Sequence, residues 1–175
     1  SDKNYTKVHG DQVSLSTVGN MCKWAATHQS QDSYNLTKCV QSFEYAKMRK
    51  PFGKPLATNQ GIQFPLAELQ TRCEMLRALI HKTAWMMDTY GNFSVSDKVS
   101  MCNYQANRLC CEAADQAMQV HGGLGYSRHK PFEHIYRHHR RYRITEGAEE
   151  IQIRRVAGYM FGFMSQQAPK GVKAD

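Results

Sequence analysis

The sequence predicts an all-α protein, folded as an antiparallel up-down four-helix bundle. Long segments of the 175-residue chain repeat apolar side chains every three or four positions, the period of a helix that buries one face. Gly and Pro gather between several of these segments, and no segment shows the alternation of a half-buried strand. Long amphipathic helices joined by short links favour a bundle whose neighbours run antiparallel.

The first predicted helix spans residues 18–48. Pro51 and Gly53 end it, because a proline disfavours helix in the preceding residue and a glycine supplies a turn. Its apolar stripe includes Met21, Trp24, Leu36, Cys39 and Phe43.

Three further helices are predicted over residues 58–90, 95–120 and 149–164. Small residues on one face of the third helix should let a neighbour approach closely. The third and fourth helices are joined by a long, glycine-containing connection, predicted to be irregular and therefore functional, because long loops in compact bundles usually are.

The chain is predicted to form one domain. We expect the bundle to occupy residues 17–165, with a polar loop or flexible tail over 1–16 and a second tail over 166–175. Nine Met, nine Tyr and seven Phe provide enough large side chains for a core, despite a mean hydropathy of -0.62. No run approaches the roughly 20 consecutive apolar residues that a membrane span needs.

Positive charge is concentrated in one part of the chain. The formal net charge is +8, and residues 128–143 carry a dense run of Arg, Lys and His. Such a run indicates a polyanionic partner, pairing with buried acidic groups, or a solvated face.

The six cysteines are predicted to be reduced, buried thiols rather than disulfides. The sequence has no C-x-x-C motif, Cys110 and Cys111 are adjacent, and several cysteines occupy apolar helical positions. Histidines at ligand spacing to them are lacking, so we expect no metal site.

Three motifs together resemble the C-terminal domain of the acyl-CoA dehydrogenases. Residues 49–56 read RKPFGKPL and are followed by Asn59-Gln60, similar to the family's R-x-x-F-G-x-x-L…Q segment. Residues 117–126 read AMQVHGGLGY, similar to A-x-Q-x-x-G-G-x-G-Y, and residues 143–151 read RITEGAEEI, similar to I-x-E-G-T-x-x-I. Their order along the chain matches the family's order.

The resemblance implies that FAD is the cofactor. Arg49, Phe52 and Gln60 would hold it, largely that of a neighbouring subunit, since a guanidinium binds a pyrophosphate through two points. The alternative is that Arg49 caps its own helix and Phe52 is a core anchor.

The other two motifs complete the implied cofactor site. Gln119, Gly122 and Gly123 would let a phosphate or adenylate group approach the backbone, although a plain glycine C-cap is the alternative. In the third motif, Gly147 and Glu150 would also contact the cofactor.

Glu146 is the candidate catalytic base that the resemblance implies. The family's glutamate removes the α-proton of an acyl-CoA thioester, and a desolvated pocket would raise its pKa toward neutrality. The alternative is that Glu146 only complements the dipole of the fourth helix, a role that Glu149 and Glu150 can already fill.

Lys23 and Trp24 are the candidate substrate-binding residues. They align with family positions just before and at an arginine near the CoA phosphate, and Lys23 would supply the positive charge. Because Lys23 is not a carboxylate, the base that some members carry on the first helix is absent, which leaves Glu146.

The resemblance also implies partners and a location. Acyl-CoA would be the substrate, an electron-transfer flavoprotein the electron acceptor, and the bundle the contact of a homodimer or homotetramer. The compartment would be reducing and intracellular, the mitochondrial matrix in a eukaryote or the cytoplasm in a bacterium. Since the family's N-terminal helical and β domains are missing from the chain, we expect it to be inactive alone.

Two alternatives remain open. A non-catalytic assembly or scaffold bundle would fit Trp24 and Ala148, which stand where the family has Arg and Thr. A relative that binds DNA would fit the basic run, although Arg137 and Arg140 also resemble family arginines that pair with carboxylates such as Asp115 or Glu112.

Overall fold

The computed structural model describes residues 42–145 and 147–164. Within these ranges every regular element is helical. Residues 42–48 are helical, and the elements that follow are η1 (Pro51–Gly53), η2 (Leu56–Thr58), α3 (Gln60–Tyr90), η3 (Asn92–Val95), α4 (Ser96–His121), α5 (Gly123–Tyr126), α6 (Phe132–Tyr142) and α7 (Glu149–Met160).

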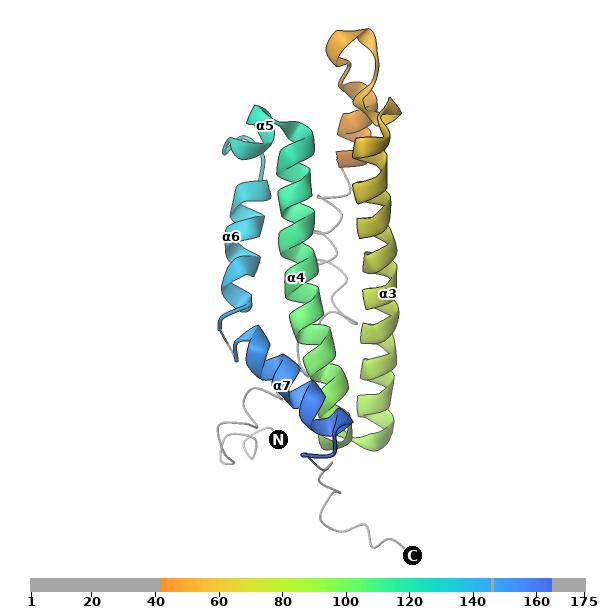
Figure 1. Cartoon of the computed structure of the whole chain (residues 1–175), viewed down its shortest axis with the longest axis vertical. Helices are drawn as coiled ribbons and strands as arrows, with labels where there is room; N and C mark the ends of the chain where they lie inside the picture. The colour runs from red at the N-terminus through yellow and green to blue at the C-terminus, as the bar shows by residue number, and fades with distance from the viewer. Residues whose placement is uncertain (1–41, 146, 165–175) are drawn as a thin grey trace, which may run out of the picture.

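Helix α4 is the central element of the described part (Figure 1). It runs antiparallel to α3 on one side, and α6 and α7 follow each other along its other side. Helix α6 lies beside the C-terminal half of α4, whereas α7 crosses the N-terminal half. The short α5 turns the chain over the end of α4 and leads into α6.

The second and third predicted helices are confirmed as α3 and α4, with boundaries within two residues. Residues 42–48 confirm the end of the first helix. The rest of that helix, Lys23 and Trp24, and the predicted terminal tails lie outside the described residues.

The prediction of an irregular connection between the third and fourth helices was wrong. Helices α5 and α6 occupy it, and α6 lies entirely within the basic run of residues 128–143. Phe132, Ile135 and His139 stand at i, i+3 and i+7 and are buried, which gives α6 one inward face. The pattern is easily missed because only three side chains form this stripe and one of them is a histidine.

The last predicted helix is also shorter than expected. Helix α7 ends at Met160 rather than Met164, because Gly162 adopts a φ of +75°. The amide N–H of Met164 then donates to the carbonyl of Gly158 at 2.9 Å and closes the helix end. One side of α4 is thus covered by two helices, α6 and α7, instead of one.

Three apolar clusters are spaced along α4. Met87, Val95, Val99 and Cys102 form the cluster between the end of α3 and the start of α4. Ala113, Ala114 and Ala117 receive Phe132 and Ile135 of α6, which confirms that small residues on this face admit a close neighbour. Ala46, Leu66 and Val120 form the third cluster, where α3 begins and α4 ends.

Burial of the thiols is confirmed for three cysteines, Cys102, Cys110 and Cys111, and Cys73 is half-buried. None of these four forms a disulfide with another described residue, and burial raises the pKa of the Cys73 and Cys111 thiols. None of the helices in the described part is both long and apolar enough to span a membrane.

Candidate functional site

A cleft of about 460 Å³ lies where α4 ends. It brings together side chains and backbone from two predicted cofactor motifs that are about 70 residues apart in sequence. Arg49 lines it from the first motif, and Gln119, Gly122 and Gly123 line it from the second. Tyr45, Leu56, Val120, His121 and Leu124 complete the lining.

The two glycines leave open space at the cleft. Gly122 has a φ of +60° and a ψ of -140°, a conformation that side chains exclude. Gly123 has no positive φ, and a Cβ built on either glycine would meet no atom within 4 Å. At position 123, neither the backbone conformation nor the packing of the described residues requires a glycine. The open backbone there would let a ligand approach closely.

His121 is held in the wall of the cleft by three contacts. Its ring stacks on Tyr45, with centroids 4.0 Å apart, and lies 4.7 Å from the ring of Phe132. Its Nδ1 lies 2.8 Å from the carbonyl oxygen of Ala117. Burial lowers the pKa of His121, and the positive charge of Lys130 lowers it further. His121 was absent from the predicted site residues, because the motif alone leaves its position open.

Phe52 and Gln60 lie apart from the residues that line the cleft. Phe52 is fully exposed in η1, so the alternative that it is a core anchor was wrong. Its φ of 56° is left-handed, a conformation that is strained for a bulky aromatic residue. Gln60 is exposed in the first turn of α3.

The third predicted motif lies at the turn between α6 and α7. Glu146 falls outside the described residues, so the structure gives no position for the candidate base. Gly147 is exposed with a φ of +94°, and Glu150 is exposed in the first turn of α7.

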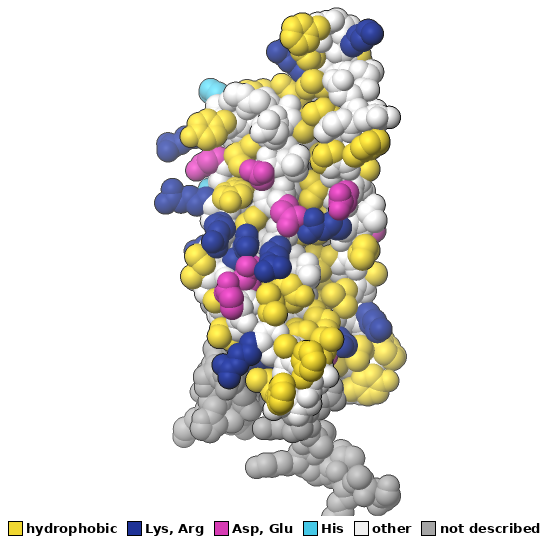
Figure 2. Space-filling model, viewed as in Figure 1, with side chains coloured by type: hydrophobic (Ala, Val, Ile, Leu, Met, Phe, Trp, Pro, Cys, Tyr) yellow, Lys and Arg dark blue, Asp and Glu magenta, His cyan; other side chains and the backbone are white. Residues whose placement is uncertain are grey.

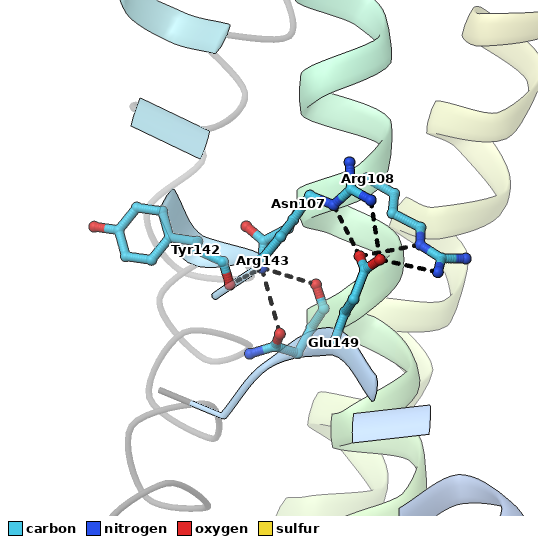
Figure 3. A network of polar contacts seen from close by, with 6 residues as sticks. Asn107, Arg108, Tyr142, Arg143 and Glu149 are labelled. Carbon is cyan, nitrogen blue, oxygen red and sulfur yellow. Dashed lines mark hydrogen bonds and ion pairs between the residues drawn. The ribbon is translucent and has the colours of Figure 1, made fainter. Parts of the chain in front are cut away.

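Glu149, the first residue of α7, is bound by two arginines (Figure 3). Arg143 donates from Nε to Oε2 at 2.8 Å and from Nη2 to Oε1 at 2.9 Å. Arg108 of α4 makes the same pair of hydrogen bonds, both at 3.1 Å. These bonds hold the pKa of Glu149 down at about 2 and raise the pKa of both guanidiniums.

The arginine–glutamate contacts join Arg143 and Glu149, which stand on either side of residue 146 in the sequence. The amide N–H of Glu149 donates to the carbonyl of Arg143 at 3.1 Å, so the two ends of the turn are joined through backbone and side chains. Asn107 of α4 adds a long contact, 3.5 Å from Nδ2 to the carbonyl oxygen of Tyr142. We call Arg108, Arg143 and Glu149 the arginine clamp. Sequence reasoning missed it, because Arg108 is 41 positions from Glu149.

The cleft and the arginine clamp lie at opposite ends of α6. Phe132 at the start of α6 contacts His121 in the cleft, and Arg143 directly follows its last residue. An 11-residue helix is about 16 Å long, so the two regions cannot share one small pocket.

The basic run is mostly solvent-exposed. Arg137, Arg140 and Arg141 are exposed on α6, and Lys and Arg side chains gather over this helix in Figure 2. The ion pairs given for the described residues do not join Arg137 or Arg140 to Asp115 or Glu112, and Glu112 pairs instead with Arg72 of α3. In the described ranges, no group of three or more His, Cys, Asp or Glu is arranged to hold a metal ion.

Comparison with protein families identifies one match. A profile described as "Acyl-CoA dehydrogenase, C-terminal domain" matches residues 35–161. The match covers all three motifs and both ends of α6.

Individual relatives agree with the family match. The chain is 34% identical over 120 residues to the caffeyl-CoA reductase-Etf complex subunit CarC of Acetobacterium woodii, covering 69% of this chain and 31% of that protein. It is 37% identical over 116 residues to the mitochondrial short-chain specific acyl-CoA dehydrogenase of Bos taurus, covering 66% and 28%. The chain therefore spans about a third of the length of the curated relatives it matches.

Solved structures share the fold. A glutaryl-coenzyme A dehydrogenase in complex with glutaryl-CoA superimposes with a TM-score of 0.77 at 25% identity, covering 94% of this chain and 40% of that one. The butyryl-CoA dehydrogenase of Megasphaera elsdenii gives a TM-score of 0.72 at 27% identity, covering 87% and 39%.

Proposed function

Because the chain belongs to the acyl-CoA dehydrogenase family through that family's C-terminal domain, we propose that it forms this domain in a flavin-dependent α,β-dehydrogenase of acyl-CoA thioesters. One observation carries the proposal beyond family membership. Arg49 meets Gln119, Gly122 and Gly123 in one cleft, although the two motifs are far apart in sequence.

The residues of the cleft fit part of a dinucleotide cofactor. Arg49 would pair with a phosphate, Gln119 would hydrogen-bond the adenylate part, and Gly123 would leave room for it. The exposed ring of Phe52 would cover an apolar ring system, with Gln60, Gly147 and Glu150 as further contacts. When bound, FAD supplies an acceptor for the hydride from the β-carbon.

Glu146 would serve as the base that removes the α-proton. The arginine clamp supports this assignment, because it ties Arg143 to Glu149 and limits the motion of the turn between them. Glu149 itself is a poor base, because its pKa of about 2 means that its carboxylate accepts a proton only weakly. Its two oxygens also already accept four hydrogen bonds from arginines.

Assembly of several copies would complete the cofactor sites. The cleft and the α6–α7 turn are separated by the length of α6, so one chain would contribute to two cofactor sites. Exposed apolar side chains offer contact surfaces on α3 and at the end of α7, where they gather in Figure 2. They include Phe64, Met75, Trp85, Met160, Phe161 and Phe163. In each copy, the helix that ends at residue 48 would continue back through residues 18–41 and complete an antiparallel up-down four-helix bundle.

The remaining features of the proposed enzyme follow from the family. Lys23 and Trp24 would contact the CoA part of the substrate. An electron-transfer flavoprotein would accept the electrons, in line with the Etf complex named for the relative from Acetobacterium woodii. Cysteines without disulfides at positions 73, 102, 110 and 111 favour a reducing intracellular compartment, such as cytoplasm or mitochondrial matrix.

The Glu146→Gln substitution tests the proposed base in the complete protein that carries this chain. Bound flavin, measured by its visible absorbance, should stay unchanged, while turnover of acyl-CoA with an artificial electron acceptor should fall at least about 100-fold. Glu74→Gln is the matched control, because Glu74 is exposed on α3 and its carboxylate contacts Gln70 and Arg77 of the same helix. Turnover retained by Glu146→Gln would exclude Glu146 as the base, and a wild-type protein that binds no flavin would overturn the proposed function.

A further inference from the structure

The imidazole of His121 is enclosed on most sides. Only 5% of the residue is exposed. Tyr45 stacks on the ring with an interplanar angle of 21°, and Phe132 lies against it at 49°. These contacts fix the plane of the ring, so its two nitrogens have defined surroundings.

The hydrogen bond at Nδ1 determines the tautomer. A carbonyl oxygen can only accept, so the 2.8 Å contact with Ala117 requires a proton on Nδ1. The pKa of His121 is lowered by burial, so the ring is neutral at pH 7. A neutral ring with its proton on Nδ1 carries a free lone pair on Nε2.

His121 can be compared with His139, which is also buried. In His139, Nε2 is sealed from solvent and has no partner among the described residues. His121, in contrast, lines the cleft, and its Nδ1 is bound to the backbone of its own helix. Nε2 is therefore the ring nitrogen left for a ligand in the cleft, which Arg49 also lines.

We propose that His121 is a specificity-determining residue of the cleft, whose Nε2 accepts a hydrogen bond from the nucleoside part of a bound nucleoside diphosphate. The donor is a ribose hydroxyl or an exocyclic amino group, and Arg49 pairs with the phosphates. This inference rests on the proposed function, because it assigns the nucleotide end of the cofactor to this cleft. It adds a residue that selects the nucleoside, whereas Arg49 recognises only charge.

Two probes separate the roles of His121 and Arg49. ADP carries both the phosphates and the donors, whereas inorganic pyrophosphate carries no nucleoside. In calorimetric titrations of the full chain, His121→Phe should weaken ADP binding about fivefold to tenfold, the value of one hydrogen bond, and leave pyrophosphate binding within about twofold. Arg49→Gln should weaken both ligands. His129→Phe is the control, because His129 is exposed and lies outside the lining of the cleft.

A spectroscopic measurement tests His121 independently of ligand affinity. In ¹⁵N-labelled protein at pH 7, long-range ¹⁵N–¹H spectra should identify Nε2 of His121 as the unprotonated nitrogen, and ADP should shift its resonance while pyrophosphate should not. A proton on Nε2, or equal loss of both ligands in His121→Phe, would overturn the inference. ADP binding that is unchanged in His121→Phe would overturn it and leave the proposed function intact. Failure of the wild type to bind either probe would overturn both.

Discussion

The polar groups near the two ends of α6 differ in whether other described residues satisfy them. At its N-terminal end, the cleft leaves polar groups open: Arg49 and Gln119 are exposed, and a Cβ on Gly122 or Gly123 would meet no neighbour. At its C-terminal end, both oxygens of Glu149 accept hydrogen bonds from two guanidiniums. Groups that the described chain leaves unsatisfied are available for a ligand, whereas groups that it satisfies stabilise the fold. The first region is therefore suited to binding and the second to positioning a turn.

Breaking the arginine clamp should have the largest effect on stability. Glu149→Gln keeps the size of the side chain but leaves the charges of Arg108 and Arg143 without their partner. We expect a loss of roughly 3 kcal/mol in the free energy of unfolding, equivalent to about 6–12 °C in Tm. Urea denaturation and calorimetry measure both quantities.

The control for this prediction is a more exposed ion pair. Glu74 and Arg77 are 2.8 Å apart, and their side chains are 53% and 55% exposed, against 11% for Glu149. Glu74→Gln should therefore change stability by less than about 1 kcal/mol. Equal losses in the two variants would show that the arginine clamp has no special structural role.

Acid should destabilise the protein through His139 before it affects Glu149. The pKa of His139 is lowered to about 4, mainly by burial, against about 6.5 in an unfolded chain. As the pH falls, the unfolded state binds this proton first, so stability is full above about pH 6.5 and is lost progressively down to about pH 4. The loss at pH 4.5 is about 2.5 kcal/mol from this group. Glu149 contributes below pH 4.5, since its folded pKa of about 2 lies under its unfolded value.

Denaturation curves between pH 7 and pH 4.5 measure this effect. His139→Phe should remove most of the slope, and His121, whose pKa is also lowered, should account for part of the remainder. His134→Phe is the control, because His134 is exposed on the same helix. A slope that persists unchanged in His139→Phe would contradict the assignment.

Local patterns in the sequence predicted the parts of the fold that depend on neighbouring residues. The 3.6-residue period identified α3 and α4, and the small residues of α4 predicted the close approach of α6. Helix α6 escaped prediction because its inward face has only Phe132, Ile135 and His139, while basic residues dominate its composition. The end of α7 escaped because a glycine in the left-handed conformation outweighed an apolar pattern that continued beyond it.

The residues of the candidate site also fall into those that local motifs predicted and those that were missed. The motifs identified Arg49, Gln119, Gly122 and Gly123, which the fold brings into one cleft. His121 and Arg108 were missed, because their roles depend on contacts with Tyr45 and Glu149 that lie 76 and 41 positions away. Contacts over such distances depend on the packing of helices, which a single sequence does not specify.

Phe52 tests directly whether a residue suited to binding lowers the stability of the fold, although the expected change in stability is the smallest of those predicted. Its left-handed backbone conformation is strained. Its ring is fully exposed, so no burial of apolar surface offsets that strain. Phe52→Gly should therefore raise the free energy of unfolding by about 0.5–1 kcal/mol, after allowance for the greater freedom of glycine in the unfolded chain. In the complete protein, the same substitution should reduce the amount of bound flavin.

The matched control is Lys54→Gly, two residues further along. Lys54 is also exposed, but its φ of -117° and ψ of 144° are ordinary for a side chain. Glycine there relieves no strain and should lower stability by about 0.5–1 kcal/mol. Opposite signs for the two variants would mean that Phe52 is retained at the expense of stability, as a residue with a binding role would be. If both variants were destabilised equally, the strain at Phe52 would be absent and the exposed ring would need another explanation.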